Sequence, residues 1–120
     1  MADKYLEATV RRASGVAVID LRGEINSFTE ETLNSAYVEA TGGNGDVVLL
    51  NFSGVDYINS TGIALIVGLL AQARKTGRRL LTCGLSDHYR EIFQITRLAD
   101  FMSIFPDEAA ALADAAQVNR

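Results

Sequence analysis

The feature that most constrains the fold is a run of four consecutive apolar residues, residues 47–50, near the middle of the chain. A strand that lacks alternation between apolar and polar side chains is one that is covered on both faces, as in a sheet with helices packed on it. A glycine-rich segment, residues 42–45, precedes the run and predicts a loop. We therefore expect a sheet that carries helices.

Four other segments have the patterns of strands. Residues 6–10 alternate apolar and polar side chains, which is the period of a half-buried strand. A turn at residues 14–15 leads into the β-branched segment 16–21, which predicts a second strand paired with the first in a hairpin, and Gly23 breaks this pattern. Two further short strands are predicted over residues 80–83 and 102–105.

Four segments have the patterns of helices. The first is capped by Ser27 or Thr29, the second ends at Gly77, and the fourth begins at Pro106. The predicted helices start near residues 30, 60, 87 and 107, and the second and third run to about residues 76 and 98. The predicted fold class is α/β, a single domain over residues 1–120. Its mixed sheet of about five strands carries about four helices in the order β-β-α-β-α-β-α-β-α.

Composition excludes several classes of function. The net charge of -4 argues against binding to nucleic acid, which needs a basic face. The single cysteine and single histidine, Cys83 and His88, leave no disulfide, no cysteine-rich metal site and no Ser-His-Asp triad. We interpret Cys83 as a small core residue and His88 as a surface residue. We therefore expect no catalytic residues, no metal and no other cofactor, and hence no enzyme.

Localisation is predicted from two further features of the sequence. The longest apolar-rich run, residues 63–73, is shorter than the roughly 20 residues of a membrane span. The first residues lack the apolar core of a signal peptide. We therefore expect a cytoplasmic protein without direct membrane insertion.

Two hydroxyl side chains, Ser60 and Thr61, stand where a predicted loop over residues 53–59 meets the second helix. The first turn of a helix has unpaired N–H groups and the positive end of the helix dipole. A phosphate on a hydroxyl there would be stabilised, while it changes the surface by almost two negative charges. The alternative is that Ser60 is only a helix cap, since Ser and Thr are common caps.

The second helix has apolar residues on two sides. One stripe, expected to face the sheet, consists of residues 63, 66, 67, 70 and 73. Leu65 and Leu69 fall on the other side, one turn or more from Ser60. Either a neighbouring helix covers these leucines, or they form an exposed patch that binds a partner.

These residues together resemble the STAS domain family, and within it the bacterial anti-sigma-factor antagonists. The most specific element is Asn-Ser-Thr-Gly at residues 59–62, within the longer match over residues 55–62. The resemblance also covers residues 23–26, 47–52, 76–79, 92–98 and 104–110.

The resemblance implies a phosphorylation switch. In that family the Ser of this motif is phosphorylated by an anti-sigma factor that is a GHKL-type serine kinase, and a PP2C-type phosphatase reverses the modification. The unphosphorylated antagonist binds the kinase and releases the sigma factor. Carried over, Ser60 is the acceptor and Thr61 the alternative. The expected partner-binding residues are Asn59, Thr61, Gly62, Leu65 and Leu69.

Asn59, Asn51 and Asn26 stand where the family often has Asp. An amide keeps hydrogen-bonding capacity but cannot accept a proton as a base. Activation of Ser60 would therefore come from the kinase, and the absence of a carboxylate at Asn59 would reduce repulsion of a phosphate.

Two other functions remain open from the sequence. The chain could be a non-switching STAS subunit of a lipid-transport ABC assembly or of a stress-signalling scaffold, with Ser60 as a cap. A nucleotide could bind near residues 53–60, at the end of a parallel strand.

The roles of several charged residues are also open. Asp20 and Glu24 could neighbour Ser60, although surface solubility is their simpler role. The basic residues 74, 75, 78 and 79 are interpreted as cations near a helix C-terminus.

Overall fold

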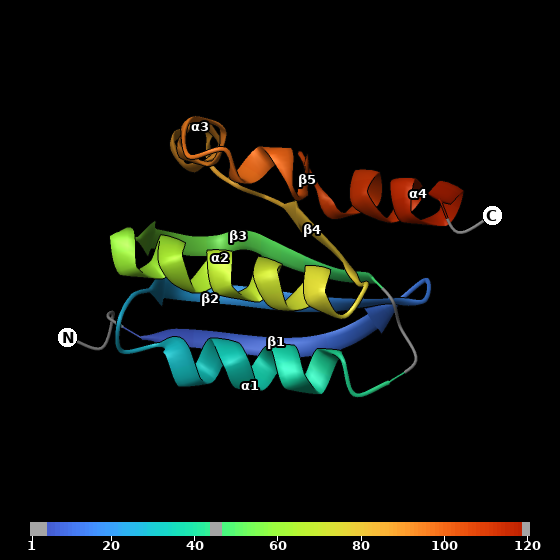
Figure 1. The fold of residues 1–120 in the computed structure, drawn as a ribbon, viewed down its shortest axis with the longest axis horizontal. Coiled ribbons are helices and arrows are strands. Elements are labelled where there is room, and N and C mark those ends of the chain that lie inside the picture. The colour runs from blue at the N-terminus through green and yellow to red at the C-terminus, as the bar shows by residue number, and fades with distance from the viewer. Residues whose placement is uncertain (1–4, 44–46, 119–120) are drawn as a thin grey trace.

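A computed structural model describes residues 5–43 and 47–118, and these form one five-stranded mixed sheet with helices on both faces (Figure 1). The strands are β1 (Leu6–Ala13), β2 (Val16–Ile25), β3 (Val47–Ile58), β4 (Arg79–Cys83) and β5 (Ser103–Phe105), in spatial order β1-β2-β3-β4-β5. Strands β1 and β2 are antiparallel, and every later neighbouring pair is parallel. The predicted fold class and order of elements are confirmed.

The helices form two unequal layers. They are α1 (Glu30–Ala40), α2 (Ser60–Lys75), α3 (Asp87–Ile95) and α4 (Glu108–Val118), with a short 3-10 helix η2 (Leu98–Asp100) after α3. Helices α1, α2 and α3 share one large core with the sheet, and α4 alone covers a smaller core on the opposite face. Figure 1 shows α1 and α2 side by side along β1 to β3, with α4 beside the C-terminal strands.

The central run of apolar residues is covered on both faces, as its pattern predicts. Val48 and Leu50 belong to the core under α1, α2 and α3, while Val47 and Leu49 belong to the core under α4. All four side chains are buried. The alternation of strand side chains thus divides one apolar run between two cores.

The predicted loop over residues 53–59 is wrong, because β3 continues to Ile58. Strand β2 also continues, through Gly23 to Ile25, and pairs with this extension as far as Ile25 opposite Ile58. The ladder contains two register shifts, and Gly23 has a φ of +111° beside one of them. Glycine therefore accommodates an irregularity within the strand where the sequence pattern indicated its end.

The third helix is shorter than predicted. Helix α3 ends at Ile95 rather than Leu98, and Arg97 follows it with a φ of 69°, in the left-handed region. Leu98 is buried in the separate 3-10 helix. The predicted helix extends to Leu98 because the apolar spacing continues past Ile95. A pattern of apolar residues does not show that Arg97 adopts a left-handed conformation. Of the predicted glycine-rich loop, residues 44–45 lie outside the described residues.

Cys83 is a small core residue, as predicted. It is buried in the core under α4. Burial raises the pKa of its thiol to about 11, with smaller contributions from the nearby carboxylates of Glu108, Asp107 and Asp20. At neutral pH the thiol is therefore protonated and shielded.

None of the helices in the described part of the chain is long and apolar enough to span a membrane.

Candidate functional site

The N-terminus of α2 is held in place by backbone and side-chain contacts from two other elements. The N–H of Asn59 donates to the carbonyl oxygen of Ile25 at the end of β2, at 3.2 Å. The N–H of Ile58 donates to the hydroxyl of Tyr89 on α3, at 2.9 Å. Asn59, the residue directly before α2, is thus fixed between the ends of β2 and β3. Ser60, the next residue, is exposed.

Asn59, not Ser60, caps the helix. The side-chain oxygen of Asn59 accepts a hydrogen bond from the N–H of Gly62 at 2.8 Å, and Ser60 is the first helical residue. Within the residues that the structure describes, the hydroxyl of Ser60 has no hydrogen-bond partner. The interpretation of Ser60 as a cap is therefore wrong, because the preceding amide already satisfies the N–H group that a cap would bind.

The first turn of α2 has no acidic residue. Ser60 and Thr61 are both exposed there, and Asn59 provides a neutral cap where aspartate would add a negative charge. The unpaired N–H groups and the dipole of a helix start favour a negative group at this position. The geometry therefore leaves Ser60 accessible and electrostatically suited to a phosphate.

Gly62 lies where no side chain fits. It is buried, and a Cβ built on it would lie 2.2 Å from the carbonyl oxygen of Ile25 and 2.9 Å from Cγ2 of Ile58. Gly62 therefore allows the start of α2 to lie directly against the ends of β2 and β3. Gly62 is among the predicted partner-binding residues, but its own chain covers it. Its role in the structure is to position Ser60.

Of the two alternatives for Leu65 and Leu69, the exposed patch is wrong. Leu69 is 1% exposed and Leu65 is partly buried against the main core, whereas Val67, expected to face the sheet, is 44% exposed. The buried residues of α2 are Gly62, Ile66, Leu69, Leu70 and Ala73. Helix α1 packs beside α2 and turns the buried stripe toward Leu69. The structure thus agrees with the alternative that a neighbouring helix covers these leucines.

Two exposed aromatic residues were missed by sequence reasoning. Phe28 is 88% exposed in the loop after β2, and its N–H donates to the side-chain oxygen of Asn26 at 2.8 Å. Tyr57 is 50% exposed near the end of β3. Tyr57 lies three residues before Ser60 and borders the start of α2, whereas Phe28 lines hollows along α1 together with Glu31 and Ser35. Apolar residues in a loop and at a strand end gave no pattern from which their exposure could be predicted.

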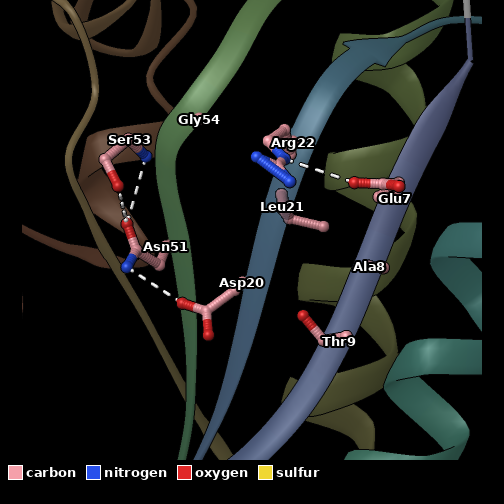
Figure 2. A pocket seen from close by; sticks show the side chains of 9 residues that line it. All are labelled: Glu7, Ala8, Thr9, Asp20, Leu21, Arg22, Asn51, Ser53 and Gly54. Carbon is pink, nitrogen blue, oxygen red and sulfur yellow. Dashed lines mark hydrogen bonds and ion pairs between the residues drawn. The ribbon is translucent and has the colours of Figure 1, made fainter.

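Asn26 and Asn51 have structural roles for their amides. The side-chain amide of Asn26 donates from Nδ2 to Glu24 at 3.2 Å and accepts at Oδ1 from the N–H of Phe28 at 2.8 Å. Asn51 donates from Nδ2 to Asp20 at 3.1 Å and accepts from the hydroxyl of Ser53 at 2.7 Å (Figure 2). Aspartate at position 51 could not make the donation and would face another carboxylate.

Asp20 belongs to a polar network that extends away from Ser60. Arg11 donates to both Asp20 and Glu108, linking β1, β2 and α4. The hydrogen bond from Arg11 is the main reason that the pKa of Asp20 and the pKa of Glu108 both lie below their ordinary values. Asp20 pairs in register with Asn51, far along β3 from Ser60. The structure therefore excludes the alternative in which Asp20 neighbours Ser60.

Glu24 lies opposite Tyr57 and accepts from the Asn26 side chain at 3.2 Å, so it does belong to the end of the sheet nearer Ser60.

A polar hollow of about 580 Å³ lies on the sheet next to Asp20 and Asn51 (Figure 2). It is lined by Glu7, Ala8, Thr9, Asp20, Leu21, Arg22, Asn51, Ser53 and Gly54. Arg22 is already paired with Glu7 at 3.2 Å, and Asp20 with Arg11 and Asn51. Arg22, the cation that could hold a phosphate, is thus already paired with a carboxylate. Nucleotide binding near residues 53–60 stays a prediction.

The remaining candidates have surface roles in the structure. His88 is exposed and its ring lies 4.8 Å from that of Tyr89. Across residues 5–43 and 47–118 there is no group of three or more His, Cys, Asp or Glu side chains that could hold a metal. The predicted basic cluster is divided: Arg79 pairs with Asp114 at 3.0 Å, whereas Arg74 lies over the ring of Phe101.

Replacing Asn59 with alanine is expected to lower the free energy of unfolding by about 1 kcal/mol, because the N–H of Gly62 loses its acceptor. Asn59→Asp keeps an acceptor oxygen and is expected to stay within about 0.5 kcal/mol of the original protein. Urea denaturation followed by circular dichroism measures both. An equal loss for the two variants would show that the cap is not the stabilising feature.

Comparison with known proteins identifies the family of the chain. The STAS domain family matches residues 7–111. A protein named as a candidate anti-sigma factor antagonist, BtrV of Bordetella bronchiseptica, is 31% identical over 112 residues, covering 90% of this chain and 94% of that protein. The anti-sigma-B factor antagonist of Listeria monocytogenes is 31% identical over 86 residues, covering 72% of this chain and 75% of that protein.

Solved structures agree on the fold. An anti-sigma factor antagonist from Mycobacterium paratuberculosis superposes with a TM-score of 0.80 at 19% identity, covering 91% of this chain and 92% of that one. The anti-sigma factor antagonist SpoIIAA in its unphosphorylated form gives a TM-score of 0.69 at 18% identity, covering 92% and 98%. With the match over residues 7–111 and the 31% identity to a protein of nearly the same extent, the chain belongs to the STAS domain family.

Proposed function

We propose that this protein is an anti-sigma factor antagonist whose binding is switched by phosphorylation of Ser60. In its unphosphorylated form it binds a GHKL-type serine kinase that acts as an anti-sigma factor, and the sigma factor is released. Phosphorylation by that kinase ends the binding, and a PP2C-type phosphatase restores it. The protein thus acts by binding rather than by catalysis. The relatives that are named anti-sigma factor antagonists support this assignment.

The observation that carries the proposal is the hydroxyl of Ser60, exposed at the first position of α2 while Asn59 performs the capping. Because the cap is elsewhere, modification of Ser60 removes no hydrogen bond that the fold needs. A phosphate adds about -1.5 to -2 charges at neutral pH, beside a helix start that favours negative charge. The switch therefore changes the surface while the fold is retained.

The partner surface on this proposal surrounds Ser60 and includes Thr61 and Tyr57. Tyr57 is an exposed aromatic near the end of β3, three residues before Ser60. Aromatic side chains that are buried on association commonly supply much of the binding energy of an interface. A charged phosphate placed among them would have to be desolvated on binding, which opposes association.

The test is transfer of phosphate from the cognate kinase. The protein is incubated with the kinase and ATP, and the modified residue is located by mass spectrometry. We expect one phosphate on Ser60, its loss in Ser60→Ala, and its retention in Thr61→Ala. Addition of a PP2C-type phosphatase should remove it. Label that survives Ser60→Ala and disappears in Thr61→Ala would assign the switch to Thr61. Binding without any modification would instead support a constitutively docked subunit.

A further inference from the structure

A second apolar surface lies at the other end of α2. It is a hollow of about 510 Å³ lined by Val67, Leu70, Ala71, Arg74, Lys75 and Phe101, which we call the α2 C-terminal groove. Phe101 follows the 3-10 helix η2 and is 54% exposed, and Val67 faces it from α2 at 44% exposed. Leu70 is buried and forms the floor. Two large apolar side chains thus remain in solvent around an apolar base.

The rim of the groove is basic and unpaired. The guanidinium of Arg74 lies 5.1 Å from the centre of the Phe101 ring, and Lys75 is exposed beside it. Every other arginine or lysine in the described ranges donates to a carboxylate or a backbone carbonyl oxygen. Among the described arginine and lysine residues, Arg74 and Lys75 are therefore those whose side chains make no such hydrogen bond, and both can pair with the carboxylates of an acidic partner.

The groove is separate from Ser60. With a rise of about 1.5 Å per residue, Val67 and Lys75 lie roughly 10 and 22 Å along the helix axis from Ser60. The screening length at physiological salt is about 8 Å, so the charge of a phosphate on Ser60 has little effect on the basic rim. A partner held in the groove would thus stay bound in both states of the switch.

We propose that the α2 C-terminal groove binds an acidic amphipathic helix of a partner protein. An apolar side chain of that helix packs between Val67 and Phe101 onto Leu70, and its carboxylates pair with Arg74 and Lys75. Charge complementarity selects this occupant, because a basic helix would bring like charges onto the rim. The recognition mode is that of an amphipathic helix in a groove.

The experiment uses the full chain, labelled with ¹⁵N, and two synthetic helical peptides of about 18 residues. Both carry the same leucine face, and the remaining positions are mainly glutamate in one peptide and lysine in the other. We expect the glutamate peptide to shift amide resonances of residues 67–75 and 101, and the lysine peptide to leave them unchanged. Phe101→Ala should weaken binding about tenfold, because the exposed aromatic is the main apolar contact. Val38→Ala, a loss of exposed apolar surface on α1, should have no effect.

A matched pair of variants tests the charges. Arg74→Gln with Lys75→Gln should weaken binding about fivefold, as expected for two exposed charge pairs. Arg22→Gln with Arg90→Gln removes the same total charge from exposed positions outside the groove and should leave binding unchanged. An equal loss in both double variants would overturn the proposal, because net charge alone would then explain it.

Three other outcomes would also overturn it. These are equal shifts with both peptides, shifts centred on residues outside the groove, and resonances of residues 67–75 that move on dilution of the protein alone, which would indicate a second copy as occupant. Sedimentation with phosphatidylglycerol vesicles provides a further arm, and binding there that is lost in Phe101→Ala would assign the groove to a membrane surface instead. These assays do not involve Ser60, so their failure would leave the proposed switch standing.

Discussion

Gly62→Ala is expected to destabilise the domain by about 3 kcal/mol, because the added methyl group has no space. Its Cβ would lie 2.2 Å from the carbonyl oxygen and 2.8 Å from the carbonyl carbon of Ile25. These are backbone atoms, so they cannot move aside as a flexible side chain would. The same carbonyl accepts the hydrogen bond from the N–H of Asn59, and a shift would weaken the attachment of α2 to the sheet.

Gly68→Ala provides the matched control in the same helix. Gly68 is exposed, and a Cβ built on it meets no atom within 4 Å. Alanine is favoured over glycine inside a helix by about 0.5 to 1 kcal/mol, so this variant should be more stable than the original protein. Guanidinium denaturation should therefore show a lower free energy of unfolding for Gly62→Ala and a higher one for Gly68→Ala. If both are destabilised, or neither is, the close contact of Gly62 with Ile25 does not constrain this helix start.

Ser60→Asp is expected to weaken binding to the kinase by about 100-fold, as when an unpaired charge is placed in an interface. The stability of the free protein should rise slightly, by about 0.3 to 1 kcal/mol, because a carboxylate at the first helical position interacts favourably with the helix dipole. The two effects have opposite directions, so a loss of binding cannot be attributed to unfolding. Surface plasmon resonance and urea denaturation measure them separately.

Ser60→Asn is the control for the charge. Asparagine has nearly the shape of aspartate without its charge, so this variant should keep most of the affinity for the kinase. Equal weakening by both substitutions would indicate that size, rather than charge, opposes binding. Undiminished binding of Ser60→Asp would contradict an electrostatic switch at this position.

Local patterns predicted the order of the elements well. The alternation of residues 6–10, the apolar run at 47–50 and the start of the third helix near residue 87 are each determined by neighbours in the sequence, and each appears in the structure. The Asn-Ser-Thr-Gly element at residues 59–62 also placed Ser60 correctly at a helix start. These features depend on periodicity and on turn chemistry, which act over a few residues.

Other features depended on contacts between distant segments. The extension of β3 to Ile58 forms because β2 pairs with it, despite the polar residues between. Leu69 is buried because α1 packs beside α2, whereas Val67 and Phe101 remain exposed because the described structure places no covering element over them. A helical pattern shows that residues share a face, but it does not show which neighbour covers that face.

The sequence by itself determined the α/β fold class, the position of Ser60 at the start of a helix, and the absence of a carboxylate at Asn59. Only the tertiary structure decided that Asn59 is the cap and that Ser60 is free of that role. It also decided that Tyr57, which lies opposite Glu24 of β2, is exposed near the site. The physical reason is that capping and burial are each competitions between several candidate groups, and their outcome depends on three-dimensional distances that local sequence does not contain.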